Sequence, residues 1–472
     1  MNNLRRVAEI VCLTGLLAYL AWVPLPFGST GDAAMTPLVL PPLVLAAAAC
    51  AMTRASRGRF TAQARWWMAG AALFIATIAL QLLPMPMALL RLLSPNAARM
   101  WAEAARVAQL AGVQTASMHP LSVEPQATAV QLFRAIAYAA TFAAAMFLVR
   151  GKPRRLTLVL VLAAMAIFET AYAVREATLH RYAIWGWKNT LIYDRATGTF
   201  VNPNHFAHYT AIILPFALFL CAYAWHTAAP AGAPRGRRFV LLVERRMAPL
   251  AFGAVAALAC VASILVAQSR GATLAAVGGL AVTGALASGR RHAATRAALI
   301  ALAAAAVFAG MFFLLRGTTR SAHFGEGGSV SLQGRRSAVI AALRIWREFP
   351  IFGSGAGTYQ NLAQRFNADS EVLLNHAHND YLETLATTGA LGFLVAAVPL
   401  LAGMVALARA AFGRSGAHAS WRRRAFCAAA LTSITIALIH ALIDFNFYIP
   451  ANPATLAAIA GAAAAVRPPE RT

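Results

Sequence analysis

Charged residues are scarce in this chain, and acidic residues are the scarcest of them. Only 12% of the 472 residues are charged, and Asp and Glu together number 16 against 41 Lys and Arg. A soluble globular protein carries about twice this charged fraction. Since 60% of the residues are hydrophobic, the composition excludes an ordinary soluble domain and indicates a polytopic membrane protein.

Cysteine is also rare, and the few cysteines show no metal-binding or disulfide pattern. None has CxxC spacing, and all lie in apolar runs: Cys12, Cys50, Cys221, Cys260 and Cys427. This argues against a disulfide framework and against a zinc site. A Walker loop is missing as well. The glycine run at 353–357 follows no βαβ strand, so it predicts a tight turn rather than a nucleotide-binding loop.

Long hydrophobic runs are what the chain has in abundance. A membrane span needs about 20 mostly apolar residues. Twelve runs qualify, or eleven if one of the two closely joined pairs forms a broken element. They are 8–25, 34–52, 66–84, 128–149, 155–174, 205–226, 248–268, 271–288, 297–315, 384–408, 425–443 and 451–466. The expected fold is therefore an all-α polytopic membrane protein, with residues 1–472 forming a single integral membrane domain.

The basic residues predict the orientation of these spans. Lys and Arg concentrate in alternate intervals: the N-terminus, 53–65, 150–155, 227–247, 289–296, 409–424 and the C-terminal tail. The positive-inside rule places those intervals and both termini in the cytoplasm. The +25 net charge is dispersed among apolar runs, which fits this rule better than a nucleic-acid-binding stripe.

Three outer intervals are long: 85–127, 175–204 and 316–383. The first predicts an interfacial surface helix near 96–110. The other two are basic, and long loops can be translocated despite their charge. This outer charge suggests either an anionic ligand or a solvated, headgroup-binding face. The interval 316–383 is the predicted large periplasmic loop, and its 336–349 stretch predicts an amphipathic helix on the membrane.

The stretch from Asn375 to Gly392 ends the longest polar interval of the chain. Asp380 and Glu383 have the spacing of an acidic capping box, which predicts a helix start near Asp380. His378 and Asn379 then lie at the mouth of a membrane helix, where backbone N–H groups favour anions. His378 is a candidate general base. The alternative is that it only hydrogen-bonds the exposed helix end.

Other outer-face residues also suggest chemistry. Asn204 is a candidate N-cap for the span at 205–226. His205 and His208 are three residues apart, but no third ligand or HExxH pattern accompanies them, so a metal site is disfavoured. Arg270 lies between two apolar spans, where it either reaches lipid headgroups or forks onto a phosphate. Asp444 lies in the last outer turn, before a predicted helix start at Asn452.

At these segments the sequence resembles the O-antigen ligase and polymerase superfamily of bacterial envelope glycosyltransferases. The family pattern is His, then Asn, Ser or Gln, nine residues, Gly, two residues, then Gly, Thr or Tyr. Here it falls on His378, Asn379, the interval 380–388, Gly389 and Gly392. Four further segments are similar to family landmarks and occur in the family's order: 198–206, 269–271, 334–357 and 444–453.

The resemblance implies a GT-C-like membrane glycosyltransferase of the bacterial inner membrane, with its active site facing the periplasm. The implied donor is a glycan on undecaprenyl pyrophosphate, and the implied reaction is inverting, with no cofactor and no metal. His378 would deprotonate the acceptor hydroxyl, and Arg270 would hold the leaving pyrophosphate. Further substrate-binding residues implied by the resemblance are Arg336, Arg195, Asn379, Asp380, Asn204 and Asp444.

The acceptor stays open at this point. A ligase transfers the chain to lipid A–core, a polymerase transfers it to another lipid-linked repeat, and a third relative glycosylates proteins. The histidine pattern favours the ligase type. A transporter or flippase is the alternative of another class, but its charges belong within the spans, and the spans hold few ionisable residues, such as Arg134 and Glu169.

Overall fold

The computed structural model describes residues 2–53, 60–188, 195–230, 232–288, 295–296, 298, 326–366, 373–413 and 420–466. Over these residues the chain is helical, with 15 α-helices and two short antiparallel β ladders. The ladders pair β1 (Met85–Pro86) with β2 (Met118–His119) and β3 (Ala183–Ile184) with β4 (Trp187–Lys188). The predicted all-α class is therefore confirmed for the described residues.

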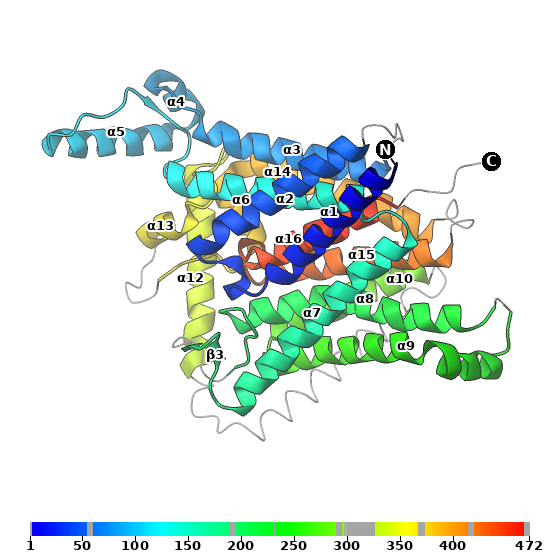
Figure 1. Cartoon of the computed structure of the whole chain (residues 1–472). Coiled ribbons are helices and arrows are strands. Elements are labelled where there is room, and N and C mark those ends of the chain that lie inside the picture. Colours follow the sequence, from blue (N-terminus) through cyan, green and yellow to red (C-terminus); the bar gives the residue numbers. More distant parts are fainter. Residues whose placement is uncertain are drawn as a thin grey trace.

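Most of the long helices run side by side in one bundle (Figure 1). They are α1 (Asn2–Trp22), α2 (Met35–Thr53), α3 (Ala62–Leu82), α6 (Pro125–Leu148), α7 (Lys152–Thr178), α8 (Pro203–Ala228), α9 (Arg235–Val266), α10 (Arg270–Ala287), α14 (Asp380–Phe412), α15 (Trp421–His440) and α16 (Ala451–Ala464). The elements outside this set are α4 (Met87–Leu93), α5 (Pro95–Leu110), α12 (Glu326–Glu348), α13 (Tyr359–Ala363) and the 3-10 turns 27–29, 32–34, 364–366 and 446–448.

Eight described helices are long and apolar enough to cross a membrane: those at 32–52, 62–82, 125–148, 152–178, 203–228, 235–266, 270–287 and 380–412. Each coincides with a predicted span. Helices also form at three more of the twelve predicted positions, as α1, α15 and α16. Of these, α16 has only 14 residues, about 21 Å at 1.5 Å per residue. The predicted span at 297–315 lies outside the described residues, apart from residue 298.

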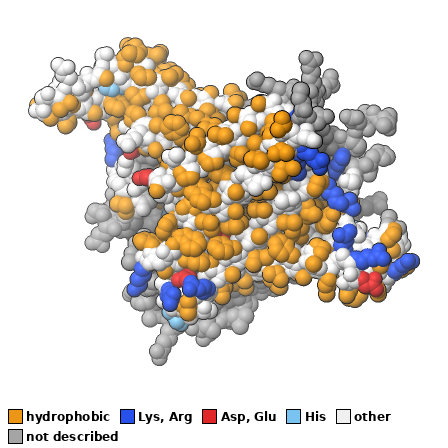
Figure 2. Space-filling model, viewed as in Figure 1, with side chains coloured by type: hydrophobic (Ala, Val, Ile, Leu, Met, Phe, Trp, Pro, Cys, Tyr) orange, Lys and Arg blue, Asp and Glu red, His pale blue; other side chains and the backbone are white. Residues whose placement is uncertain are grey.

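Helix α8 is the centre of the bundle. In its most apolar stretch 83% of the residues are buried, against 17% in the span containing α2 and 22% in α14. The outer helices therefore bury one side and expose the other. Figure 2 shows hydrophobic side chains covering the middle of the visible face, with most of its Lys and Arg gathered beyond one end of the helices. A broad exposed apolar surface of this kind fits burial in lipid.

The two ends of the bundle differ in charge. Helices α1, α3, α7, α9 and α15 begin at the end rich in Arg, which we call the arginine-rich end. There Arg154 pairs with Glu9 at 2.7 Å, and Thr61 donates a hydrogen bond to the Ala464 carbonyl. Helices α10 and α14 begin at the opposite end, together with the 441–450 turn. We call this opposite end the site end.

Helix α14 is broken at Gly389, which has φ 66° and ψ −177°. The break frees backbone groups that an unbroken helix would pair internally. The amide of Ala390 instead donates to the Pro350 carbonyl at 2.8 Å, and that of Leu391 donates to Ile351 at 3.1 Å. A loop segment thus completes the hydrogen bonds of the broken helix, as an apolar environment requires.

Gln81 of α3 joins the same junction from the other side. Its Nε2 donates to the carbonyls of Thr387 at 2.9 Å and Phe352 at 2.7 Å, and its Oε1 accepts from the Ala356 amide. The Gly355 amide also donates to the Thr387 carbonyl at 3.0 Å. These bonds fix the first turns of α14 relative to α3 and to the loop.

The glycine run at 353–357 forms the predicted tight turn. Gly353, Gly355 and Gly357 all have positive φ, at 74°, 120° and 84°. A Cβ at Gly353 would lie 2.3 Å from the Thr387 carbonyl. The turn can therefore press its backbone against α14 only because these positions carry no side chain.

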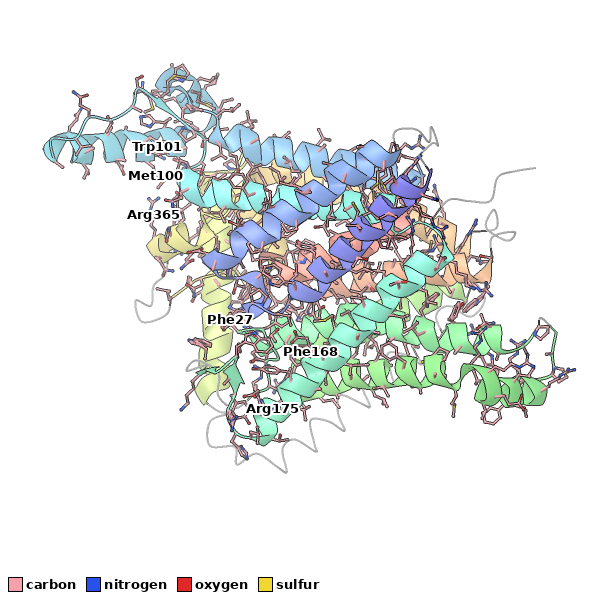
Figure 3. All side chains as sticks on the ribbon, in the orientation of Figure 1. Phe27, Met100, Trp101, Phe168, Arg175 and Arg365 are labelled. Carbon is pink, nitrogen blue, oxygen red and sulfur yellow. The ribbon has the colours of Figure 1, made fainter. Side chains whose placement is uncertain are left out.

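A second hydrophobic core covers the site end. It joins α4, α5, α12, α13 and the start of α14 through buried residues such as Leu90, Leu121, Ile345 and Tyr359. Helix α12 runs across the bundle direction (Figure 1), as the predicted amphipathic helix should. The predicted helix at 96–110 forms as α5, but it projects beyond the bundle instead of lying across it. Figure 3 shows its Met100 and Trp101 near Arg365, whose Nη1 lies 3.6 Å from the Met100 sulfur.

Candidate functional site

His378 and Asn379 lie directly before α14, at the predicted mouth of the helix. The helix begins at Asp380, as predicted, but Asn379 is its N-cap: its side chain accepts a hydrogen bond from the Leu382 amide at 3.0 Å. The Asn379 Nδ2 donates to the Leu442 carbonyl at 2.9 Å. Asn379 thus ties the helix start to the turn that follows α15.

The predicted capping box of Asp380 and Glu383 does not form, because both carboxylates have other partners. Glu383 accepts from the Ala377 amide at 2.7 Å and lies 2.8 Å from His376 Nδ1. Buried Asp380 accepts from the Phe447 amide at 3.2 Å through Oδ2. The two carboxylates therefore fold the segment before α14 against the 444–448 turn.

His378 itself adopts an uncommon backbone conformation. Its φ is 49°, in the left-handed region that residues other than glycine rarely occupy. Its side chain is 32% exposed, and its Nδ1 lies 3.4 Å from Asp444 Oδ1. Because Nδ1 faces the carboxylate, Nε2 is the ring nitrogen left for another partner. A strained histidine of this kind is a candidate functional residue.

Asp444 is the buried anion at the centre of the site. Its side chain accepts hydrogen bonds from Asn204 Nδ2 at 2.9 Å and from the Phe445 amide at 3.0 Å. His205 Nε2 lies 3.8 Å from the same carboxylate. Burial raises the pKa of Asp444, but the His205 and His378 imidazoles together lower it more, so its pKa lies well below the usual range. Asp444 is therefore ionised at neutral pH.

Asn204 connects Asp444 to Arg195. Its Oδ1 accepts from Arg195 Nη2 at 3.0 Å, while its Nδ2 donates to Asp444. Asn204 is not the predicted N-cap of α8, because Asn202 occupies that position and accepts from the Asn204 amide. Arg195 also donates from Nε and Nη2 to the Ala267 carbonyl, at 2.9 and 2.6 Å. Arg195 thereby joins the start of α8 to the α9–α10 turn.

Arg270 is the first residue of α10, and its side chain is exposed. Ser269 caps this helix by accepting from the Ala272 amide. The next residue, Gly271, packs so closely on His440 that a Cβ would lie 2.7 Å from its Nε2. The start of α10 is therefore beside the end of α15, the helix that leads into the Asp444 turn.

Arg336 is exposed on α12, and among the described residues it is not seen to contact those around Asp444. Its neighbour Arg335 interacts electrostatically with His440. The structure thus brings together His378, Asn379, Asp380, Asn204, Asp444 and Arg195, and it places Arg270 on the adjoining helix start.

Sequence reasoning missed three residues of this site: His205 as a partner of Asp444, His440 and Phe445. The two histidines weighed as a metal pair have different partners, since His208 Nδ1 lies 2.9 Å from His440 Nδ1. The Phe445 ring packs against the rings of His205, His376 and His378, at centroid distances of 4.6, 4.1 and 5.0 Å. In the sequence, only the polar segment Asp444–Asn446 indicated that this turn could belong to the site.

Chemically, the arrangement pairs a half-exposed imidazole with a buried carboxylate. The carboxylate can hold the ring and stabilise its protonated form, so the other ring nitrogen can accept a proton. Among the described residues, no group of three or more His, Cys, Asp or Glu is arranged to hold a metal ion.

A comparison with known protein families finds one match to this chain. Residues 254–397 match the family described as O-antigen ligase. The matched range includes Arg270, Arg336 and His378, whereas Asn204 and Asp444 lie outside it. No curated protein matches the chain. Together with the apolar helices, the match identifies a membrane protein that carries an O-antigen ligase family domain at residues 254–397.

Proposed function

We propose that this chain is a membrane glycosyltransferase that moves a glycan from undecaprenyl pyrophosphate to an acceptor hydroxyl. The most strongly supported form is the O-antigen ligase type, in which lipid A–core is the acceptor. The family match supports a polysaccharide-related transferase with lipid-linked glycan substrates. The specific reaction is our inference from the residues described above.

The observation that carries the proposal is the 3.4 Å approach of His378 Nδ1 to Asp444 Oδ1. In the proposed step, Nε2 of His378 removes the proton of the acceptor hydroxyl. The acceptor oxygen forms a bond to the anomeric carbon as the bond from that carbon to pyrophosphate breaks. A single displacement inverts the anomeric configuration. Asp444 stabilises the imidazolium that results, and a positioned base of this kind contributes about 10²- to 10⁴-fold in rate.

The departing pyrophosphate needs fixed positive charge where its negative charge develops. We assign this role to Arg270 and to the amide groups at the start of α10. Arg195 donates to the Ala267 carbonyl and to Asn204, so we propose that it positions Asn204 and Asp444. Arg336 is proposed to contact the donor from α12. The step as written requires no cofactor and no metal.

The distribution of the basic residues supports a proposal for the side of the membrane on which this reaction takes place. We propose that residues 1–472 form one multi-pass domain of the bacterial inner membrane, with the arginine-rich end in the cytoplasm. The site end then faces the periplasm, and 316–383 is its large periplasmic loop. We also propose that the fold is GT-C-like and that the chain crosses the membrane about twelve times.

Three alternatives differ from it in the acceptor or in the class of protein. A polymerase would use a second lipid-linked glycan, and a protein O-oligosaccharyltransferase would use a protein hydroxyl. A transporter would need charged groups along a path through the spans. Glu169, an acidic residue within a span, instead accepts hydrogen bonds from the amide and hydroxyl of Thr199 at 2.9 and 2.7 Å. This pairing anchors a loop, which favours the enzyme.

The test is glycan transfer by the purified full-length protein from a lipid-pyrophosphate donor. Lipid A–core, a second lipid-linked glycan and a protein are offered separately as acceptors, each with and without EDTA. We expect transfer to lipid A–core that EDTA does not change and that His378→Ala lowers by about 10²-fold or more. The matched control is His180→Ala, because His180 is exposed. Transfer at the wild-type rate by a folded His378→Ala protein would refute the proposed base.

A further inference from the structure

A second histidine–carboxylate pair lies beside His378 at the start of α14. His376 Nδ1 lies 2.8 Å from Glu383 Oε1, and the other oxygen of Glu383 accepts a hydrogen bond from the Ala377 amide at 2.7 Å. The Glu383 side chain is 1% exposed and the His376 side chain is 26% exposed. A buried carboxylate that holds a partly exposed imidazole is an arrangement that catalytic sites use to orient the ring. The transfer step proposed above gives neither residue a role.

Aromatic contacts hold the His376 ring in the same place as the His378 ring. His376 stacks on the Phe445 ring at a centroid distance of 4.1 Å and an interplanar angle of 18°, and the Tyr448 ring lies 5.0 Å away. The His378 ring meets the same Phe445 ring edge to face at 5.0 Å. One phenylalanine thus carries two imidazoles, and each imidazole has its Nδ1 toward a carboxylate. Because Nδ1 of His376 faces Glu383, Nε2 is the ring nitrogen that a substrate can meet.

The two carboxylates face their histidines differently. Asp444 lies 3.4 Å from His378 Nδ1 and also faces His205 at 3.8 Å, so two imidazoles share its negative charge. Glu383 lies closer to its histidine, at 2.8 Å. Since the attraction between charges grows as their distance shortens, a positively charged His376 ring gains more from Glu383 at this distance. An imidazolium donates from both ring nitrogens. His376 is therefore suited to donate a hydrogen bond from Nε2, whereas His378 is suited to accept a proton.

The proposed displacement needs such a donor on its departing side. As the bond from the anomeric carbon breaks, its electron pair stays on the pyrophosphate oxygen, which becomes more negative. The backbone N–H groups at the start of α14 favour an anion near His376. We propose that the His376 imidazolium donates a hydrogen bond from Nε2 to this oxygen, and that Glu383 is the positioning residue that holds the ring. The acceptor proton still passes to His378, and His376 keeps its own proton. This inference rests on the proposed function.

Glycan transfer by the purified full-length protein tests the proposal with two variants that each keep part of the ring's hydrogen bonding. His376→Asn keeps an amide donor near the position of Nδ1, where it can reach Glu383, but it places nothing at Nε2. His376→Gln carries its amide donor farther out, toward the position of Nε2. We expect His376→Asn to lower kcat about 10²-fold with the KM for the donor little changed, and His376→Gln to recover part of that loss. Wild-type kcat in His376→Asn would mean that the ring only ties down Glu383.

Glu383→Gln tests the positioning role, because it keeps the size of the side chain and removes its charge. It should lower kcat on its own and have little further effect in the His376→Asn background. Losses that simply add would contradict the claim that Glu383 acts through His376.

Binding of the departing group, measured by native mass spectrometry without an acceptor, gives a readout that needs no turnover. The probes are undecaprenyl pyrophosphate, which carries the departing phosphate, and undecaprenyl phosphate, which lacks it. His376→Asn should bind the pyrophosphate about tenfold more weakly than wild type and the monophosphate equally well. Equal losses for both probes would indicate a disturbed fold and would overturn the proposal. The matched control is His378→Asn, which should lose transfer but bind both probes like wild type.

The two assays separate this inference from the proposed function. Wild-type transfer together with wild-type kcat and pyrophosphate binding in His376→Asn would overturn the role of His376 alone. Wild-type protein that transfers no glycan to any acceptor would overturn the proposed function, and this inference with it.

Discussion

Replacing Gly389 by Ala tests whether the broken start of α14 is as closely packed as the structure shows. The φ of 66° and ψ of −177° lie in a region that is almost exclusive to glycine, and a residue with a Cβ pays about 1–3 kcal/mol there. A Cβ would also lie 2.2 Å from the Ile351 carbonyl oxygen. Because this contact is with backbone, it cannot be relieved by a rotamer change, and it adds about 1–3 kcal/mol. We expect a total loss of about 2–6 kcal/mol.

The assay is reversible unfolding of the purified protein in detergent, followed by far-UV circular dichroism. The matched control is Gly112→Ala. Gly112 also has positive φ, at 73°, but a Cβ there meets nothing within 4 Å. The control should lose only the conformational part, about 1 kcal/mol. If the two variants lost the same stability, the close insertion of the 350–355 loop into α14 would be refuted.

Three further substitutions probe the supports and the charges of the site. Gln81→Leu leaves the carbonyls of Thr387 and Phe352 without their side-chain donor, so we expect a loss of about 2–4 kcal/mol in the same unfolding assay; a change below 0.5 kcal/mol would contradict this role. Asp444→Asn should destabilise the protein at pH 7. Since the folded pKa of Asp444 is depressed, its stabilisation is complete above the unfolded value of about 3.9 and is lost as pH falls through the folded value. The difference in melting temperature should therefore shrink toward pH 3, and a difference that grows there would show that the sign is wrong. Arg270→Lys should lower kcat/KM for the lipid-pyrophosphate donor about tenfold with unchanged stability, because Lys cannot bind phosphate bidentately; unchanged kinetics would reassign Arg270 to lipid headgroups.

Sequence periodicity and hydropathy predicted most of the helices, because a membrane span must be both apolar and internally hydrogen-bonded. The start of α14 at Asp380 was predictable from local polar residues. The identity of its cap was not, since Asn379 and Asp380 are both good caps and tertiary contacts decide between them. Asp380 accepts from the Phe447 amide of a distant turn, which leaves Asn379 to cap the helix.

The sequence allowed the site to be predicted as a set of outer-face residues, but it did not predict how these residues are arranged in space. Nothing local to Asp444 indicates that Asn204 and His378 lie beside it, because those contacts join three separate turns. His440 closes an apolar run and gave no signal of its own. Its place in the site depends on Gly271, whose missing side chain lets α10 approach α15 closely. The assigned roles of all these residues stay predictions.

A double-mutant cycle of His378→Ala and Asp444→Asn, measured as glycan transfer from the lipid-pyrophosphate donor, tests the central claim most directly. If Asp444 acts by holding and stabilising the His378 imidazole, Asp444→Asn should lower kcat strongly in the wild-type background and have little further effect once His378 is Ala. The folded state of each variant is checked by the unfolding assay. Losses that simply add would mean that the two residues act independently, and they would contradict the proposed histidine–carboxylate base.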